Sequence, residues 1–594
     1  MRFLSMYKYV LCVVLLTLGS CSGMRESAPP SGAVLQADIR WTAYGIPHVK
    51  ADDWAGLGYG FAYATARDGV CVIARELVLL DGQMSRYFGS DDDNRSSDVF
   101  HLAVLQPDRL AAYNASESDN SKAFSRGYIA GYNRYLRDHA DTLPLDCNGE
   151  PWVRPMNDLD IAKMAIGVGI RYGLGRLRKE MAAAAPPTNG VDLATALSTD
   201  FNAPKGYGSN AIAMGRAITA SKRGLLFGNP HYPWEGPSRF HMIHTTIPGE
   251  LDVMGVSLIT TPRVAIGFNR DVAWTHTVST ALRSTFYELQ LNPDNPMQYR
   301  YEDVFRDIEE VRVLVAETDE QGAISSAEHT VYFSHYGPIV ESQALPWDDQ
   351  RAYAVRDANL ANTRTGLTYD ALNNARSIAE VKAALDLQGV AWTNTLAADR
   401  HGGALYADIS VTPNVDMELL KRCRLTPTDV PARAVVLRGD SAQCEWKEDA
   451  RSAIPGVLPA QEMPHLQRDD YVANSNDSYW LSSPLQPLEG YSPIIGNERQ
   501  ARSLRTRAGL VFIEEYLDKE QKFEALDLQQ MLYSHRNYGA ELLLDDLLVL
   551  CAAQGGPVQL LDEPVDISPA CQALDAWDRR MTVSSHGGHV WREF

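Results

Sequence analysis

The stretch Tyr207-Gly-Ser-Asn-Ala-Ile-Ala-Met-Gly215 divides the chain into two parts of different character. Before it, residues 183–208 contain a run of alanines, Pro-Pro and Asn-Gly pairs and further glycines, which are typical of an exposed connector that tolerates cleavage. After it, short apolar runs separated by Gly, Pro and Asn predict β-strands. Ser209 therefore stands where cleavage would create a new N-terminus at the start of a sheet.

A serine at a new N-terminus carries its own general base. Its α-amine has a pKa of about 7.7–8.0 and accepts the hydroxyl proton near neutral pH, so no His-Asp pair is needed. The sequence therefore predicts self-cleavage between Gly208 and Ser209, with Ser209 as the nucleophile. Glycine before the cleaved bond permits the strained backbone that this step requires.

The periodicity of apolar residues predicts a layered α+β fold, because β-rich segments alternate with helical ones. Asp91-Asp92-Asp93 is interpreted as a solvated loop. Upstream of Ser209 we expect short strands in residues 37–50, around a turn at Gly45, and helices over 54–80 and 122–182. Downstream we expect strands at 210–218, 225–228, 254–259, 264–269 and 272–278, a hairpin at 394–410, and helices over 367–386 and 508–555.

The composition fits a soluble enzyme that is larger than one small domain. The chain has 594 residues, of which 45% are hydrophobic and 22% charged. Its formal net charge of −20 would repel phosphate backbones, so nucleic acid is not an expected partner.

The first residues are typical of a targeting segment. A positively charged start precedes the apolar run Tyr9–Leu18, which is too short to span a bilayer and predicts a signal peptide over residues 1–20. Leu18-Gly-Ser-Cys21 resembles a bacterial lipoprotein box, so we expect lipidation of Cys21 and a tether over 21–36; ordinary signal cleavage nearby is the alternative. The protein is then periplasmic or anchored at the cell envelope, with membrane contact only through a lipid.

The remaining cysteines permit a disulfide framework. An even number of cysteines in an exported chain favours disulfides over buried free thiols, although six cysteines allow fifteen pairings. Sequence order favours two local loops, with the third pair left over. The favoured pairs are Cys423–Cys444, Cys551–Cys571 and Cys71–Cys147.

Motifs of other enzyme classes are missing from the sequence. It has no G-x-S-x-G elbow, H-E-x-x-H, C-x-x-C or P-loop. His241 and His244, like His586 and His589, are spaced three apart, but no cysteine or carboxylate cluster supports metal binding. We therefore expect no metal and no other cofactor.

An ordered set of segments resembles the penicillin-type acylases, which are N-terminal nucleophile hydrolases and include the acyl-homoserine-lactone and aculeacin acylases. The resemblance covers nearly everything after the signal peptide. It is carried by Tyr44-Gly-Ile-Pro-His48, Gly58-Tyr-Gly-Phe-Ala-Tyr-Ala64, Gly208-Ser-Asn-Ala211, Gly228-Asn-Pro-His231, Phe240-His241, Ile247-Pro-Gly-Glu-Leu-Asp-Val-Met-Gly255, Ala273-Trp-Thr-His-Thr-Val278, Tyr336-Gly-Pro338, Asn394-Thr-Leu-Ala-Ala-Asp399 and Ala473-Asn-Ser-Asn-Asp-Ser-Tyr-Trp480.

The resemblance implies an αββα sandwich with a helical α subunit wrapped around it. On this basis residues 37–182 form the α subunit, 183–208 a connector propeptide and 209–594 the catalytic β subunit. The two fragments would remain together as a heterodimer. The end of the chain, Gly587-Gly-His-Val-Trp-Arg-Glu-Phe594, resembles a segment well inside the family's β subunit, so we expect a truncated β subunit; a naturally short variant is the alternative.

The resemblance also implies roles for individual residues. Ser209 would attack the acyl carbonyl, and the backbone N–H of Val278, sixty-nine residues later, would bind the oxyanion. The second oxyanion donor would be the side chain of Asn476. Arg502 matches the family arginine that positions this asparagine, with Arg505 as the second choice and a surface salt bridge as the alternative role for either.

His231 and the segment after Val278 distinguish branches of the family. Acyl-homoserine-lactone acylases place a histidine where His231 falls, whereas penicillin G acylases usually have glutamine; a structural role and a proton-relay role for it remain open. Penicillin G acylases bind calcium partly through aspartates shortly after the oxyanion valine. The segment Ser279–Thr285 has no carboxylate, so no calcium is expected there.

The expected activity is hydrolysis of an amide that joins an apolar acyl chain to a polar amine. The expected partner is a small acylated substrate, either an acyl-homoserine lactone or an acylated peptide. Acylase activity on penicillins or cephalosporins is the first alternative. The second is a lipoprotein that binds acylated ligands without turnover, against which the presence of Ser209, Val278 and Asn476 argues.

Overall fold

The computed structural model describes residues 34–187, 207–427, 430, 434–560 and 563–594. The predicted signal peptide, the lipidation of Cys21 and most of the connector lie outside these residues. The chain divides into two units, Met1–Val34 and Leu35–Phe594, and everything below concerns the second. Within the described ranges, no helix has both the length and the apolar character needed to cross a membrane.

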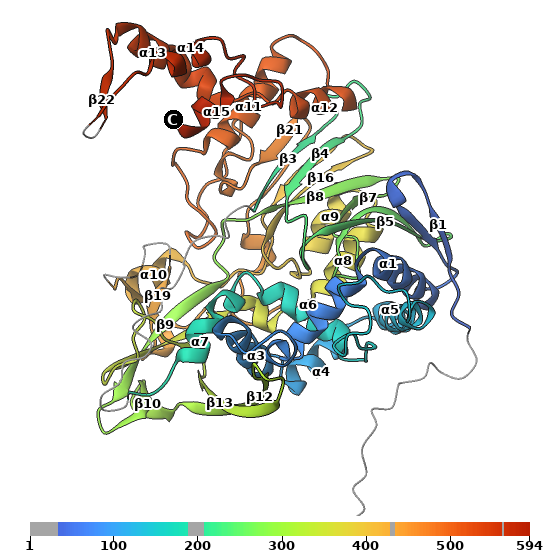
Figure 1. Cartoon of the computed structure of the whole chain (residues 1–594), viewed down its shortest axis with the longest axis vertical. Coiled ribbons are helices and arrows are strands. Elements are labelled where there is room, and N and C mark those ends of the chain that lie inside the picture. The colour runs from blue at the N-terminus through green and yellow to red at the C-terminus, as the bar shows by residue number, and fades with distance from the viewer. Residues whose placement is uncertain (1–33, 188–206, 428–429, 431–433, 561–562) are drawn as a thin grey trace, which may run out of the picture. The chain divides into compact units, whose positions relative to one another are not determined.

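Helices dominate the part of the chain before Ser209 (Figure 1). The main pair is α1 (Trp54–Leu80) and α5 (Asp119–Asp138). Glycines allow these helices to approach closely: a Cβ at Gly127 would lie 1.9 Å from the Ala55 carbonyl oxygen, and one at Gly58 would lie 2.0 Å from that of Phe124. The others are α2 (Met84–Tyr87), α3 (Asp92–Val104), α4 (Pro107–Ser116), α6 (Asp160–Ile170) and α7 (Arg178–Ala183).

Two packed sheets form the centre of the fold. The small sheet has the order β21-β3-β4, and its strands contact β8, β16 and β17 of a large sheet. The small sheet consists of β21 (Tyr471–Asn474), β3 (Gly208–Met214) and β4 (Leu225–His231). The large sheet runs β1 (Asp38–Trp41), β2 (Pro47–Lys50), β5 (Phe240–Ile247), β6 (Leu251–Leu258), β7 (Ile266–Phe268), β8 (Val272–Val278), β16 (Thr393–Asp399), β17 (Ala404–Ala407) and β20 (His465–Arg468).

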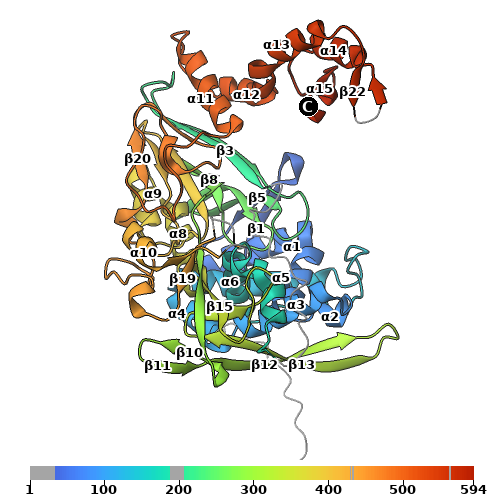
Figure 2. The ribbon, with the colours of Figure 1, turned by 90° about the vertical axis from the view of Figure 1, so that its left-hand side faces the viewer.

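Helices cover both sheets. Successive side chains of β3 alternate between two apolar clusters, which shows how the layers are arranged. Ala211 and Ala213 belong to the main core, whereas Ile212 and Met214 belong to a separate apolar cluster with α11 (Leu504–Leu517) and α12 (Ala525–Tyr533). Successive residues of a strand point to opposite faces, so β3 lies between the large sheet and these helices. Helices α8 (Thr365–Asn374) and α9 (Ile378–Leu385) pack on the large sheet. The order of layers is therefore αββα (Figure 2).

A second large sheet was not predicted. It has the order β11-β10-β9-β15-β14-β13-β12, with β19 beside β9 and β18 beside β19. Its strands are β9 (Ser284–Asn292), β10 (Asn295–Tyr301), β11 (Val304–Asp307), β12 (Glu309–Thr318), β13 (Ile324–Ser334), β14 (Gly337–Val340), β15 (Arg351–Asp357), β18 (Arg424–Leu425) and β19 (Val436–Arg438). The remaining elements are α10 (Met417–Cys423), α13 (Tyr538–Ala553), β22 (Val558–Leu560), β23 (Glu563–Val565), α14 (Ser568–Asp575) and α15 (Gly588–Glu593).

The prediction of an α+β fold is confirmed, and one local prediction is wrong. Asp91-Asp92-Asp93 is not a loop: the Asp91 carboxylate accepts the Asn94 N–H as an N-cap, and Asp92 and Asp93 lie in the first turn of α3. Carboxylates are favourable there because they satisfy free N–H groups and complement the helix dipole.

The structure joins the same cysteine pairs that sequence order favours. Cys71 bonds to Cys147, Cys423 to Cys444 and Cys551 to Cys571. Each pair lies entirely before or entirely after Ser209. These disulfides therefore do not link the two sides of the predicted cleavage site.

Candidate active site

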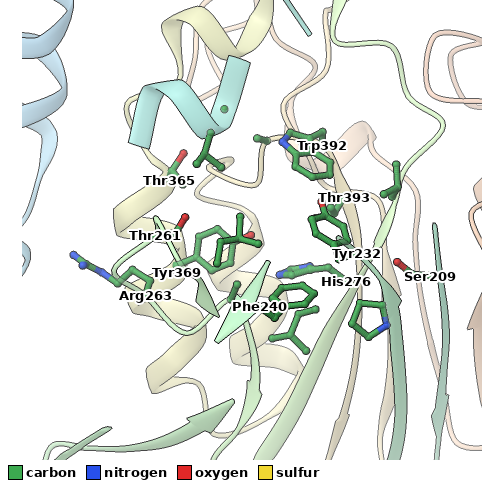
Figure 3. Close-up of a pocket in the computed structure, with 18 residues that line it drawn as sticks. Ser209, Tyr232, Phe240, Thr261, Arg263, His276, Thr365, Tyr369, Trp392 and Thr393 are labelled. Atoms are coloured by element: carbon green, nitrogen blue, oxygen red, sulfur yellow. The ribbon is translucent and has the colours of Figure 1, made fainter. Parts of the chain in front are cut away.

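Ser209 lies near the start of β3 with only 2% of its surface exposed. It is on the same face of the strand as Ala211 and Ala213, which points its side chain toward the large sheet. In the ladder with β4, Ser209 lies opposite Pro230 and Gly208 lies opposite His231. Ser209 also lines an apolar pocket (Figure 3).

The surroundings of Gly208 leave little room for a side chain. A Cβ at this position would lie 3.2 Å from Asn476 Oδ1 and 3.2 Å from His231 Nδ1. The Ser209 hydroxyl donates to the Gly208 carbonyl oxygen, so the nucleophile is in contact with the peptide group that it would cleave. The structure therefore describes the uncut chain with the reacting groups already adjacent.

Asn476 connects Ser209, the predicted nucleophile, to the end of β8. Its Oδ1 accepts the Ser209 N–H at 2.5 Å, and its Nδ2 donates to the Val278 carbonyl oxygen at 3.0 Å. Its φ of 66° is left-handed, a conformation that asparagine adopts more readily than most residues. Asn474 supports it by accepting the Asn476 N–H at 2.9 Å on Oδ1.

The backbone N–H of Val278, the predicted oxyanion donor, points away from β16. Val278 lies opposite Thr393, and the Ser279 N–H donates to the Trp392 carbonyl oxygen at 3.2 Å. This pattern makes Val278 and Thr393 a non-hydrogen-bonded pair, in which the backbone N–H points away from the partner strand. The Val278 N–H therefore points away from β16 and is not used in that ladder.

The arginine at Asn476 is Arg505 and not Arg502. Arg505 Nη2 donates to Asn476 Oδ1 at 2.9 Å, and Nη1 donates to the Ser209 carbonyl oxygen and to Asn210 Oδ1. Burial lowers the pKa of Arg505 from its usual range. Arg502 instead donates to Ser478 Oγ at 2.9 Å and lies 5.1 Å over the Trp480 ring. Arg502 precedes the N-cap of α11, whereas Arg505 is in its first turn, a difference that spacing alone did not reveal.

Substitution of the two arginines should separate these roles. Arg505→Ala removes contacts with Ser209, Asn210 and Asn476, and we expect kcat to fall by about tenfold or more, as for loss of hydrogen bonds to a charged group. Arg502→Ala is the matched control and should lower kcat by less than about threefold, typical of a peripheral contact. Steady-state kinetics on the processed proteins measure both; an equal loss in the two variants would contradict the assignment.

His231 is next to the cleavage site but not on the serine hydroxyl. Its Nε2 lies 2.9 Å from Asn229 Oδ1 and 3.4 Å from Asn210 Nδ2. Burial, and secondarily the charge of Arg505, lowers the pKa of His231 and favours the neutral ring. Both roles considered for it from sequence stay open.

The pocket beside Ser209 combines residues of the predicted motifs, such as Phe240 and Val278, with residues that no motif identified, such as Tyr369 and Trp392. The lining residues come from strands, from helices α6 and α8 and from the segment before β16, and no single stretch contains more than a few of them. Aromatic rings dominate its lining: Trp392 lies 6.3 Å from Tyr232 in a stacked arrangement, and Tyr232 lies 5.1 Å from Phe240. Its lining includes Tyr232, Phe240, Leu258, Ile266, Val278, Tyr369 and Trp392. An apolar chain fits such a lining.

An arginine is buried in the segment Ser279–Thr285, for which the sequence predicted no calcium. Arg283 Nη1 donates to Ser410 Oγ, Thr412 Oγ1 and the Val411 carbonyl oxygen at 2.6–3.1 Å. Burial lowers the pKa of Arg283 to about 10. Over the described ranges no three His, Cys, Asp or Glu side chains group as metal ligands. The histidine pair of β5 has other contacts: His241 with Thr65, and His244 with His48 and Asp252.

The chain is similar in sequence to several known acylases. Acyl-homoserine lactone acylase PvdQ of Pseudomonas putida is 39% identical over 95% of this chain and 73% of its own length. Aculeacin-A acylase of Actinoplanes utahensis is 37% identical over 94% of this chain and 74% of its own. The solved thermostable penicillin G acylase of Alcaligenes faecalis, orthorhombic form, matches 63% of this chain and 60% of its own, with 17% identity and a TM-score of 0.45.

The sequence profile of the penicillin amidase family matches residues 36–594, which is nearly the whole described chain. The αββα layers agree with the fold that the resemblance implied. The chain therefore belongs to the penicillin amidase family of amide-bond hydrolases.

Proposed function

We propose that this protein is a self-processing amidohydrolase that removes an apolar acyl chain from an amide, with Ser209 as the nucleophile. The observation that carries the proposal is the position of Ser209. Its side chain is buried at an apolar pocket and its N–H contacts Asn476. Val278, whose N–H points away from β16, lines the same pocket. A protein that only binds its ligand would not require a serine, an asparagine and a backbone N–H to be placed together at the pocket.

Self-cleavage precedes catalysis. The Ser209 hydroxyl attacks the Gly208 carbonyl carbon, the peptide C–N bond breaks, and the resulting ester is hydrolysed by water. The products are a new carboxylate at Gly208 and a free α-amine at Ser209. This amine is held close to Asn476 Oδ1, which already accepts the Ser209 N–H in the uncut chain.

Hydrolysis of the substrate repeats the same chemistry. The α-amine takes the hydroxyl proton, Ser209 Oγ attacks the substrate carbonyl, and the oxyanion accepts hydrogen bonds from the Val278 N–H and Asn476 Nδ2. The protonated α-amine then donates its proton to the leaving amine as the C–N bond breaks. Water, deprotonated by the same amine, hydrolyses the acyl-serine ester and releases the acid.

We propose an acyl-homoserine lactone or an acylated peptide as the substrate class. Two named relatives, an acyl-homoserine lactone acylase and aculeacin-A acylase, support this choice at 39% and 37% identity. The aromatic pocket supports an apolar acyl group. Acylase activity on penicillin or cephalosporin is the second candidate. It is favoured only by the description of the matching family, penicillin amidase.

The proposal extends to assembly and location. Residues 37–182 would form the α chain and 209–594 the β chain of a heterodimer, after loss of the connector at 183–208. Export to the periplasm, with a lipid anchor on Cys21, is proposed from the N-terminal sequence. The three disulfides support an oxidising compartment.

A denaturing gel, N-terminal sequencing and a substrate panel test this proposal. The purified protein should run as two fragments even without reductant, because no disulfide of the described residues crosses the cut. The larger fragment should begin Ser-Asn-Ala-Ile. The processed protein should release homoserine lactone or deacylated peptide faster than it cleaves penicillin G. A single uncut chain that still hydrolyses amides would refute Ser209 as the nucleophile. A processed protein that binds these amides without cleaving them would favour the binding role.

A further inference from the structure

The pocket beside Ser209 contains polar atoms that its apolar lining does not satisfy. Thr393 Oγ1, His276 Nε2 and Thr261 Oγ1 are all buried without a hydrogen-bond partner, and all three residues line the pocket (Figure 3). Leaving a buried polar group unpaired costs about 1–3 kcal/mol, so native structures rarely do so without a reason. Atoms that enter the pocket are therefore expected to supply the missing partners.

Of these three groups, Thr393 is the one that pairs with Val278, whose N–H is the proposed oxyanion donor. It lies directly opposite Val278 in the ladder between β8 and β16, and this is the non-hydrogen-bonded pair identified above. In such a pair the two Cα atoms are about 4.5 Å apart and both side chains lie on the same face. The Thr393 hydroxyl is therefore level with the carbonyl group that Ser209 would attack.

His276 stands one step further along the same face. It is two residues before Val278 on β8, so both side chains point into the pocket. Its Nδ1 lies 3.2 Å from the Asn394 carbonyl oxygen and 3.1 Å from Thr395 Oγ1, while Tyr369 packs edge-on at 5.7 Å.

The His276 ring is neutral and one of its nitrogens remains unpaired. Burial lowers the pKa of His276 to about 4, partly offset by the carbonyl groups of Asn394 and Ala265. With Nδ1 occupied, Nε2 is left for a ligand in either tautomer: it accepts a hydrogen bond when Nδ1 carries the proton and donates one when Nε2 does.

We infer that the pocket recognises an acyl chain with a hydroxyl group close to the scissile carbonyl, most directly on the β carbon. A hydroxyl both donates and accepts, so it can pair with Thr393 Oγ1 and His276 Nε2 together, whichever tautomer His276 adopts. This inference rests on the proposed function, because it concerns the acyl group of the same amide substrate.

A charged acyl chain fits the pocket less well. Arg263 lines the end away from Ser209 (Figure 3), but its guanidinium pairs with Asp370 at 2.5 Å and lies 3.7 Å from Glu117. The cation is therefore neutralised within the protein. A carboxylate on the acyl chain would meet two acids beside this arginine, whereas a neutral hydroxyl meets no repulsion.

The test compares three homoserine lactone amides with the processed protein: decanoyl, β-hydroxydecanoyl and ω-hydroxydecanoyl. A new hydrogen bond in a dry pocket should raise kcat/KM for the β-hydroxy substrate by about tenfold over decanoyl. Any gain of the ω-hydroxy substrate would depend on Thr261 at the other end of the pocket, so Thr393→Val should leave that gain unchanged. Thr393→Val removes the hydroxyl with little change of shape, and His276→Phe removes the ring nitrogens. Either change should bring the ratio of β-hydroxydecanoyl to decanoyl turnover close to one.

Thr261→Val is the matched control. It removes the same group from the end of the pocket away from Ser209, so the β-hydroxy ratio should stay at the wild-type value (Figure 3). A wild-type ratio near one, or a high ratio that Thr393→Val and His276→Phe leave unchanged, would overturn the inference.

Binding of the product acids separates this inference from the proposed function. Calorimetry on the wild-type protein should show tighter binding of β-hydroxydecanoic acid than of decanoic acid, whether or not amides are cleaved. If none of the three amides is hydrolysed by fully processed protein, the proposed activity fails for this class. Preferential binding of the hydroxy acid would then still support recognition by Thr393 and His276, and equal binding would overturn it.

Discussion

Ser209→Ala is expected to leave one uncut chain with no measurable amidase activity. The substitution removes the only atom proposed to attack both the Gly208 carbonyl and the substrate. Without cleavage no α-amine forms, so the nucleophile and the base are lost together. We expect kcat to fall by about 10⁴–10⁶, as when the residues of a serine-based site are removed.

The fold should survive this change. The lost atom makes one described contact, with the adjacent Gly208 carbonyl oxygen, and alanine fits the strand position without steric conflict. Circular dichroism and thermal unfolding should therefore match the wild-type precursor. The comparison is made on purified protein by denaturing gel and by hydrolysis of an acyl-homoserine lactone.

Ser209→Cys provides the matched control. A thiol keeps a nucleophile at the same position, so this variant should still form two fragments, with altered turnover. If Ser209→Ala were cut at the same bond, or hydrolysed amides at a rate near that of wild type, another residue would have to be the nucleophile.

The sequence predicted the strand and the residues of the proposed catalytic centre better than the segments that surround this centre. The strand at Val272–Val278 and the helix at Trp54–Leu80 have the bounds expected from their apolar patterns. Ser209 and Asn476, which the resemblance assigned to one active site, are 267 residues apart in sequence and are in contact in the structure. Their chemistry restricts the residue type at each position, which makes them recognisable in a single sequence.

The parts that sequence did not predict depend on packing between distant segments. Arg505 takes the place expected of Arg502 because the N-cap of α11 is at Ser503, and one helical turn decides which guanidinium faces Asn476. Tyr369 and Trp392 line the pocket from a helix and a connecting segment. Aromatic residues on such elements look like ordinary core residues until the tertiary structure brings them together.

Asn476→Ala should give a folded protein that turns over its substrate about 10²–10³ times more slowly, because it removes one oxyanion donor worth about 2.7–4 kcal/mol in the transition state. In the uncut chain Nδ2 donates to the Val278 carbonyl oxygen at 3.0 Å, beside the Val278 N–H. Release of this bond would allow Nδ2 to point at an oxyanion held by the same valine. KM should change much less than kcat, since the donor acts mainly on the developing charge.

Two side effects of the substitution must be separated from the loss of the donor. Oδ1 accepts the Ser209 N–H at 2.5 Å, so cleavage of the precursor should also slow down. Alanine tolerates the φ of 66° less well than asparagine, which should lower thermal stability slightly. Rates must therefore be divided by the fraction of processed chains, measured by gel and N-terminal sequencing.

Asn476→Asp distinguishes the donor from the acceptor. Aspartate keeps an oxygen for the Ser209 N–H and for Arg505, at 2.5 and 2.9 Å in the wild-type protein, but it has no N–H and adds a negative charge beside the oxyanion. Processing should therefore be closer to wild type than in Asn476→Ala, while kcat should fall at least as far. Full kcat in either processed variant would show that Asn476 is not the second oxyanion donor. A different group would then have to donate to the oxyanion beside the Val278 N–H.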